Sequence, residues 1–292
     1  MPSSSSVGTV SSVQLNPRYG DHPIIHVEGL REDPVALMVR QHHRLAALLA
    51  GLDDAQWQAA SRCEGWTVQD VITHLTSVNQ FWAYSIATAL AGAPSTFLAS
   101  FDPVRSPAEL VAAAGSPSTS ETLASFVASL EALDTTLDSV GDRIWDTLAE
   151  APPGHVAIGC VAMHALWDSG IHERDIALPL GLPLDEHADE LAVSLIYAAA
   201  LNLAFHASTG SERTGALEIR TSNPDVHVGV ELTDSVRVRP GAAPHGAFVL
   251  TGSTLEALEA LSCRTPLAVD VSADHQWLFD GLSIVFDQST TG

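Results

Sequence analysis

The spacing of the apolar residues changes once along this chain, near residue 210, and this change most limits what the chain can fold into. Up to about residue 209 the apolar side chains recur with the period of an amphipathic α-helix. After that point they alternate with polar ones, as in half-buried strands, over 216–221, 226–232, 236–239 and 247–250. We therefore predict a helical domain over 31–210 and a small α+β domain over 211–292, preceded by a flexible tail over 1–30.

The predicted helices begin at recognisable N-caps. Asp33 precedes Pro34, which suits the first helical position. Thr67 is followed three residues later by Asp70, a variant of the capping box. The predicted helices of the first domain span 33–51, 67–91, 120–140, 154–176 and 186–207. Amphipathic helices in this arrangement favour an antiparallel bundle. In the second domain we expect a short helix over 254–262, a strand over 267–271 and a last segment over 277–286.

The charge balance argues against several classes of function. The chain has 13 basic and 35 acidic residues, a net charge of −22, so we expect neither nucleic acid nor a membrane surface as a partner. All the basic residues are arginine, which excludes a lysine Schiff base, pyridoxal phosphate attachment and a Walker A lysine. The apolar run over 191–205 is too short for a membrane span and predicts a buried helix.

The cysteines and the N-terminus bear on the compartment. The three cysteines, Cys63, Cys160 and Cys263, are odd in number and widely spaced, which favours a reducing cytoplasm over a disulfide framework. The serine-rich segment 1–16 lacks the features of a signal peptide. We expect a cytoplasmic monomer or homodimer, with Cys63 and Cys160 acting as small apolar side chains rather than nucleophiles.

The most informative local pattern is the series His164, Asp168 and His172 in the fourth predicted helix. Residues four apart share a helix face, so Asp168 and His172 can converge on one ion, with a third ligand from another helix. His74 is the histidine well inside such a helix. Two imidazoles and a carboxylate with an open position are typical of catalytic zinc. An ordinary hydrogen-bonded pair with a satisfied core histidine is the more frequent alternative. His42, on the apolar face of the first helix, is either a core residue or a substrate contact.

Two separated blocks of sequence carry a resemblance to a known family. The chain resembles the mycothiol-dependent maleylpyruvate isomerases of the DinB-like superfamily over about residues 32–209. The similar segments are LDDAQW at 52–57, RCEGWTVQDVITHL at 62–75, WDSGIHERDI at 167–176 and LPLG at 178–181. The C-terminal part, with LTGS at 250–253, is similar to the family's sterol-carrier-like domain. The resemblance implies a mainly α fold: a DinB-like antiparallel four-helix bundle followed by a small α+β domain.

The resemblance also implies a site. A divalent ion, usually zinc, would be held by His74, Asp168 and His172, although better-studied members have the longer glutamate at the position of Asp168. Mycothiol would be the co-substrate, with its sulfur at or near the open position as a thiolate. The thiolate would act on an electrophilic small molecule, by isomerisation or by S-transfer. Asp175 would orient the ring of His172, His164 would lie beside Asp168, and His42 is a candidate for proton transfer.

Two further functions fit the same residues. One is a thiol-independent biosynthetic tailoring enzyme or metal hydrolase on the same fold, in which the ion would activate water. The other is a non-catalytic small-molecule binding protein, with an apolar pocket in the C-terminal domain.

Overall fold

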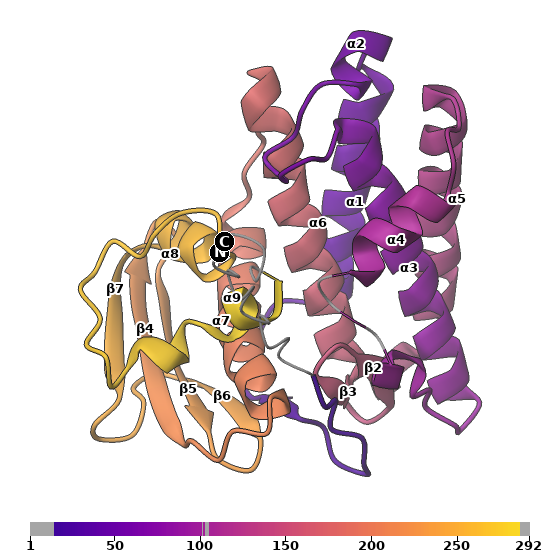
Figure 1. Cartoon of the computed structure of the whole chain (residues 1–292). Coiled ribbons are helices and arrows are strands. Elements are labelled where there is room, and N and C mark those ends of the chain that lie inside the picture. The colour runs from indigo at the N-terminus through magenta and orange to yellow at the C-terminus, as the bar shows by residue number, and fades with distance from the viewer. Residues whose placement is uncertain (1–14, 101, 103–104, 287–292) are drawn as a thin grey trace, which may run out of the picture.

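The structure, a computed structural model, describes residues 15–100, 102 and 105–286, without the side chains of 284–286. A helical bundle and a sheet-containing domain lie side by side, with one long helix between them (Figure 1). The helices are α1 (Pro34–Ala50), α2 (Asp54–Trp57), α3 (Val68–Leu90), α4 (Ser106–Ala113), α5 (Thr119–Asp138), α6 (Ile158–Leu180), α7 (Ala188–Ser208), α8 (Thr254–Leu261) and α9 (Gly281–Phe286). The strands are β1 (Ile25–Val27), β2 (Leu148–Ala151), β3 (Gly154–Ala157), β4 (Gly215–Ser222), β5 (Val226–Leu232), β6 (Val236–Pro240) and β7 (Phe248–Ser253). Short 3-10 helices are η1 (Phe97–Ser100), η2 (Gly141–Trp145) and η3 (Gln276–Leu278).

The predicted four-helix bundle is confirmed and consists of α1, α3, α5 and α6. The predicted caps are present: Asp33 accepts from the backbone amides of the first turn of α1, and Thr67 forms a complete capping box with Asp70. Helices α3 and α6 are antiparallel, because His74 lies beside His172 and Trp82 beside His164.

Helices α3 and α5 of the bundle run in the same direction. Gln69 donates to Thr122, and ten residues later Asn79 contacts Ser129. The chain between α3 and α5 includes η1 and α4 and returns to the end of the bundle at which α3 begins. The sequence analysis did not predict α4, whose eight residues bury no side chain.

The C-terminal domain is a five-stranded sheet in the order β1-β6-β5-β4-β7. The pairs β6–β5 and β5–β4 are antiparallel, whereas β1 pairs with β6 and β7 pairs with β4 in parallel. Strands β4 to β7 confirm the strands predicted from the alternating pattern, and α8 confirms the predicted short helix. The predicted strand over 267–271 is wrong, because these residues form no ladder with any described strand.

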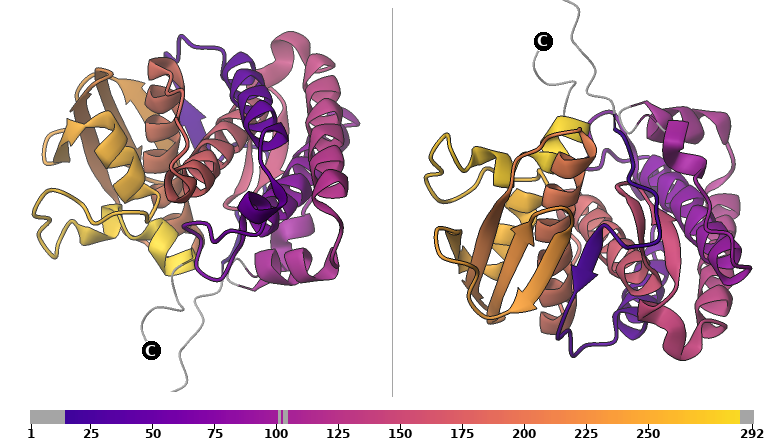
Figure 2. Two further views of the ribbon diagram at one scale, coloured as in Figure 1. Left: turned by 90° about the horizontal axis from the view of Figure 1, so that it is seen from above. Right: turned by 90° about the horizontal axis from the view of Figure 1, so that it is seen from below.

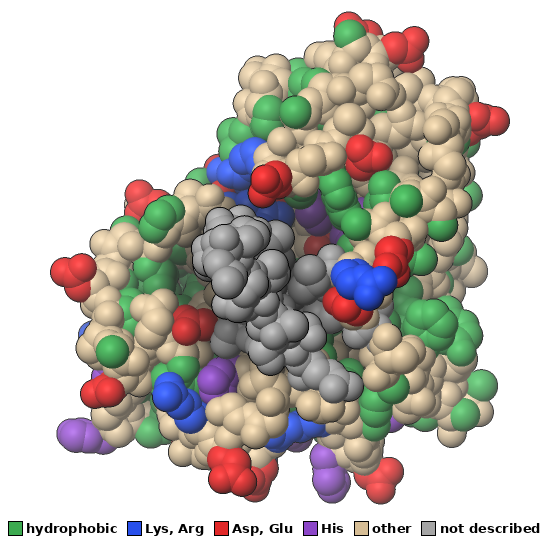
Figure 3. All heavy atoms as spheres, viewed as in Figure 1, with side chains coloured by type: hydrophobic (Ala, Val, Ile, Leu, Met, Phe, Trp, Pro, Cys, Tyr) green, Lys and Arg blue, Asp and Glu red, His purple; other side chains and the backbone are tan. Residues whose placement is uncertain are grey.

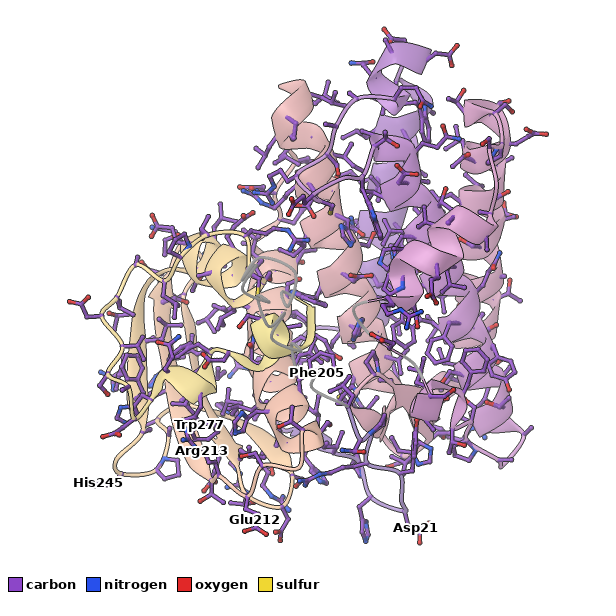
Figure 4. The ribbon with its side chains drawn as sticks, viewed as in Figure 1. Asp21, Phe205, Glu212, Arg213, His245 and Trp277 are labelled. Atoms are coloured by element: carbon purple, nitrogen blue, oxygen red, sulfur yellow. The ribbon has the colours of Figure 1, made fainter. Side chains whose placement is uncertain are left out.

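Helix α7 joins the two parts of the molecule. It packs against α6 on one side and against α8, α9, β5 and β6 on the other. Phe205 of α7 and Trp277 of η3, labelled in Figure 4, are both buried in the larger apolar core. By length and composition α7 could cross a membrane, with a hydropathy of 1.5, but 83% of that window is buried inside the protein. It is the buried helix that the sequence predicted.

The N-terminal prediction needs a correction. Residues 1–14 lie outside the described part of the chain, but Ile24 and Ile25 are buried and β1 is the edge strand beside β6 (Figure 2). Residues 24–27 are therefore part of the C-terminal sheet and not of a tail. The hairpin β2–β3 was also missed: it occupies the start of the predicted fourth helix, so that α6 begins at Ile158.

The apolar core has two clusters, and the candidate site lies at their junction. On α3, Val71 and Leu75 belong to the smaller cluster, whereas Trp82 belongs to the larger one. On α6, Ile176 belongs to the smaller cluster and Ile171 to the larger one. On α3, His74 lies between residues of the smaller cluster, whereas on α6 Asp168 lies between Trp167 and Ile171 of the larger one.

Candidate metal site

Three side chains from two helices meet at this junction. The ligand-type atoms of His74, Asp168 and His172 all lie within 4.8 Å of one another. The Asp168 carboxylate is 3.8 Å from Nε2 of His74 and 3.6 Å from Nε2 of His172. The structure thus brings together the three residues that the sequence named, although His74 is about a hundred positions from the other two.

The two imidazoles differ in their protonation. Burial, and then the proximity of His172, lowers the pKa of His74 to about 3, so this ring is neutral and offers a lone pair. Burial alone would also lower the pKa of His172. The hydrogen bond to Asp175 and the contact with Cys63 instead raise it to about 10. A cation at Nε2 can therefore replace a proton that the surrounding carboxylates already favour.

Asp175 makes the contact with His172 that the sequence analysis expected. Its Oδ2 atom lies 3.0 Å from Nδ1 of His172, and its side chain is fully buried. Although burial would raise the pKa of Asp175, its bonds with His172 and Arg264 hold that pKa well below the usual value. An ionised Asp175 accepts a hydrogen bond from Nδ1–H of His172, which leaves Nε2 facing Asp168 and His74.

Sequence reasoning missed the two arginines that hold Asp175. Arg62 donates from Nε to Oδ1 at 2.9 Å, and Arg264 donates to Oδ2 at 2.8 Å. Arg264 comes from the turn after α8, so the C-terminal domain contributes to this site. Nothing in the sequence links Arg264 to Asp175, because they are 89 positions apart. Arg62 lies within the quoted motif, where it could have been considered.

Cys63 is closer to the site than its interpretation as a small apolar residue implied. Its Sγ atom lies 3.3 Å from Oδ2 of Asp175, as a donor, and 3.6 Å from Nδ1 of His172. Cys160, by contrast, is fully buried, and burial raises the pKa of its thiol to about 12. The interpretation as a small apolar side chain holds for Cys160 and is incomplete for Cys63.

His42 and His164 do not join the ligand group. His42 is fully buried, and neither ring nitrogen makes a hydrogen bond of ordinary geometry within the described residues. Burial lowers its pKa to about 4, although the nearby backbone of Ala165 offsets part of this effect. The candidate role of His42 in proton transfer stays a prediction, and its burial places it apart from the three candidate ligands. His164 contacts the hydroxyl of Tyr197 at 2.8 Å, and its ring packs against Trp82.

The three donors suit a small divalent ion. Ligand atoms in a tetrahedral zinc site lie roughly 3.3–3.5 Å apart, given bonds of about 2.0–2.2 Å. Oδ2 of Asp168 lies 3.8 Å from Nε2 of His74, and Oδ1 lies 3.6 Å from Nε2 of His172, slightly more than this.

The site is accessible from one side. The side chains of His74, Asp168 and His172 are 16%, 15% and 9% exposed. Figure 3 shows histidine, acidic and basic side chains next to one another where the bundle faces the C-terminal domain. Three protein donors would leave the fourth position of a tetrahedral ion open.

The protein is a helical bundle with a histidine–aspartate–histidine group on its helices α3 and α6, packed against a sheet-containing domain. The family model of the mycothiol maleylpyruvate isomerase N-terminal domain matches residues 38–177, which include all three candidate ligands. This part of the helical bundle is therefore similar to that family's N-terminal domain, which supports the resemblance seen in the sequence.

Two solved structures have the same fold. One is the mycothiol-dependent maleylpyruvate isomerase, with 17% identity, a TM-score of 0.57 and coverage of 84% of this chain and 91% of that chain. The other is a histidine-to-alanine mutant of such an isomerase, with 16% identity and the same TM-score and coverage. A search of curated proteins gives no match.

Proposed function

We propose that this chain is a divalent-metal-dependent enzyme that uses mycothiol to isomerise, or to transfer sulfur to, an electrophilic small molecule. The observation that carries the proposal is the convergence of His74, Asp168 and His172 within 4.8 Å. Zinc is the metal that this donor set favours. The family match supplies the thiol, since the matched domain is that of mycothiol maleylpyruvate isomerases.

The residues of the chain have separable roles in this proposal. His74 and His172 offer imidazole nitrogens, and Asp168 offers a carboxylate that offsets part of the charge of the ion. Asp175 holds the ring of His172 in one tautomer, and Arg62 and Arg264 keep Asp175 ionised. A divalent ion bound there favours the thiolate over the thiol of a sulfur ligand.

The part of the bundle that faces the C-terminal domain is the proposed substrate site. The three donors are partly exposed, and Arg264 of the C-terminal domain lies next to them through Asp175, as is common for small-molecule sites between domains. An electrophile bound there would lie next to the thiol sulfur, so the reaction becomes intramolecular within the complex. The widely spaced cysteines support a cytoplasmic location, which is part of the same proposal.

Metal analysis of the purified protein, with activity assays, tests the proposal. We expect about one divalent ion per chain, loss of activity with a chelator, recovery with zinc, and turnover of electrophiles only when mycothiol is present. Activity that needs the metal but not mycothiol would favour the hydrolase or tailoring enzyme. A protein that retains no ion after incubation with zinc, and whose stability does not change with a chelator, would overturn the proposal.

A further inference from the structure

A continuous series of hydrogen bonds connects helix α8 of the C-terminal domain with the ring of His172. Glu259 of α8 accepts from Nη1 and Nη2 of Arg62 at 2.8 and 3.1 Å. Nε of the same guanidinium donates to Asp175 at 2.9 Å. Asp175 in turn lies 3.0 Å from Nδ1 of His172. Three contacts therefore separate a residue of the second domain from a candidate metal ligand in the bundle.

The groups in this series are shielded from solvent. The side chains of Glu259 and Asp175 are 6% and 0% exposed, and that of Arg62 is 23% exposed. Salt and water screen such charges less than they screen surface pairs. A bidentate pair also fixes the plane of the guanidinium, which a single contact does not. The backbone amide of Arg62 donates to the carbonyl of Asp175, which holds the two residues together.

The guanidinium of Arg62 divides its hydrogen bonds between two carboxylates, those of Glu259 and Asp175. Glu259 accepts one hydrogen bond from each terminal nitrogen, and Nε is the nitrogen that donates to Asp175. Without Glu259 the terminal nitrogens would be free to turn towards Asp175. They would then compete with Nδ1 of His172 for the same carboxylate. The extra positive charge would also oppose a cation nearby.

We propose that Glu259 is a positioning residue for the metal ligand His172, acting through Arg62 and Asp175. This inference rests on the proposed metal site. In effect, the C-terminal domain sets the metal affinity of the bundle. Arg264 contacts Asp175 directly, whereas Glu259 controls how many hydrogen bonds the other arginine can give to Asp175.

The alternative is an adhesive role, in which Glu259 only holds the two domains together. Glu259 also contacts Arg174 of α6, so it links the two domains in either case. An adhesive residue would change the melting temperature when replaced, but not the metal affinity of the folded protein. A positioning residue changes that affinity.

The test is a zinc titration of the full chain against a chromophoric chelator, with the visible spectrum of the cobalt-substituted protein as a second readout. Glu259→Gln keeps the size of the side chain and removes its charge. We expect zinc affinity to fall about 3- to 10-fold, less than the roughly 10- to 100-fold expected for Asp175→Asn, and the cobalt spectrum to change. Glu259→Asp should recover part of the affinity.

The matched control is Glu256→Gln. Glu256 lies one turn earlier on α8, is exposed, and has the same charge. We expect its replacement to leave zinc affinity within about twofold, since screening weakens distant surface charges. If Glu259→Gln does not fold, Arg62→Lys tests the same link, because it keeps the charge but loses the fork.

The outcomes separate the two proposals. Zinc affinity equal to wild type in Glu259→Gln, or in Arg62→Lys, with weaker affinity in Asp175→Asn, would overturn the role of Glu259 and leave the metal site intact. Wild-type protein that binds zinc no better than His172→Ala would instead overturn the metal site, and with it this inference.

Discussion

Two buried histidines of the bundle, His42 on α1 and His172 on α6, have opposite surroundings. His172 has Asp175 at Nδ1 and Asp168 near Nε2. His42 makes no hydrogen bond of ordinary geometry at either ring nitrogen within the described residues, and only the backbone of Ala165 offsets part of its burial. Against the effect of burial, the partners of His172 raise its pKa to about 10, whereas burial lowers that of His42 to about 4.

The comparison shows that the partners of a buried histidine, rather than its burial, indicate function. Both residues lie on core-facing positions of amphipathic helices and are at most 7% exposed. One ring can exchange a proton for a metal ion, and the other remains neutral at physiological pH. Substitutions at the two positions should therefore have opposite consequences.

The largest expected effect is the difference in zinc binding between two single variants, His172→Leu and His42→Leu. His172→Leu removes one of three donors and leaves Asp168 and Asp175 without their shared partner, so we expect zinc affinity to fall at least about 100-fold. His42→Leu should retain one zinc per chain. Metal analysis of both purified variants checks this, and equal metal content in the two would contradict the assignment of His172.

Asp168→Asn has the next largest effect and tests the charge of the site. It preserves the shape of the side chain but removes the anion between the two imidazoles, whose Nε2 atoms lie 3.6 and 3.8 Å from it. We expect roughly 10- to 100-fold weaker zinc binding by competition titration. Asp185→Asn, an exposed residue in the connection between α6 and α7, is the matched charge control. Unchanged affinity in Asp168→Asn would remove this residue from the ligand set.

The sequence predicted the features that depend on neighbouring residues. The caps at Asp33 and Thr67 are local, and the pair Asp168 and His172 follows from helical spacing alone. His74 came from its position inside another helix and from the family resemblance. In these cases the signal lies within a few turns of one element.

The missed features depend on contacts between distant parts of the chain. Strand β1 has three residues, and its partner β6 is about 210 positions away. So short a segment has no alternating pattern in the sequence that would predict a strand. The convergence of Arg62 and Arg264 on Asp175 has no local signature either. His42 was placed correctly on a core-facing position, but the absence of a partner becomes visible only when α1 and α6 are packed together.

We expect His42→Leu also to change how the free energy of unfolding depends on pH below neutrality. The pKa of His42 is about 4 in the folded protein and near 6.5 when exposed, so between these values the unfolded chain binds a proton that the folded chain does not. Wild-type stability therefore falls as pH falls through this window, by at most about 1.4 kcal/mol per pH unit. Leucine removes this dependence and also two buried polar atoms that lack partners, a gain of about 1–2 kcal/mol at pH 7.

Urea unfolding of both proteins at pH 7, 6, 5 and 4.5 measures this effect. The stability difference between His42→Leu and wild type should grow as the pH decreases. A constant difference would mean that His42 has a proton or hydrogen-bond partner in the folded protein. Trp82→Phe, which removes another buried nitrogen without a partner but no titratable group, is the control and should show a pH-independent difference.

The smallest expected effect on zinc affinity is at Cys63, which contacts both His172 and Asp175. Its thiol donates to Asp175 at 3.3 Å, but Asp175 keeps its bonds to His172, Arg62 and Arg264 when the thiol is removed. We therefore expect Cys63→Ala to change zinc affinity by less than about threefold, because one weak donor among four is lost. Cys63→Ser, which keeps a donor, should lie closer to wild type. Turnover with mycothiol, measured on metal-loaded Cys63→Ala, tests whether the thiol of Cys63 has a role in the reaction. Loss of activity at full metal content would show that Cys63 takes part in it. The comparison of His42 with His172 would then omit a reactive group.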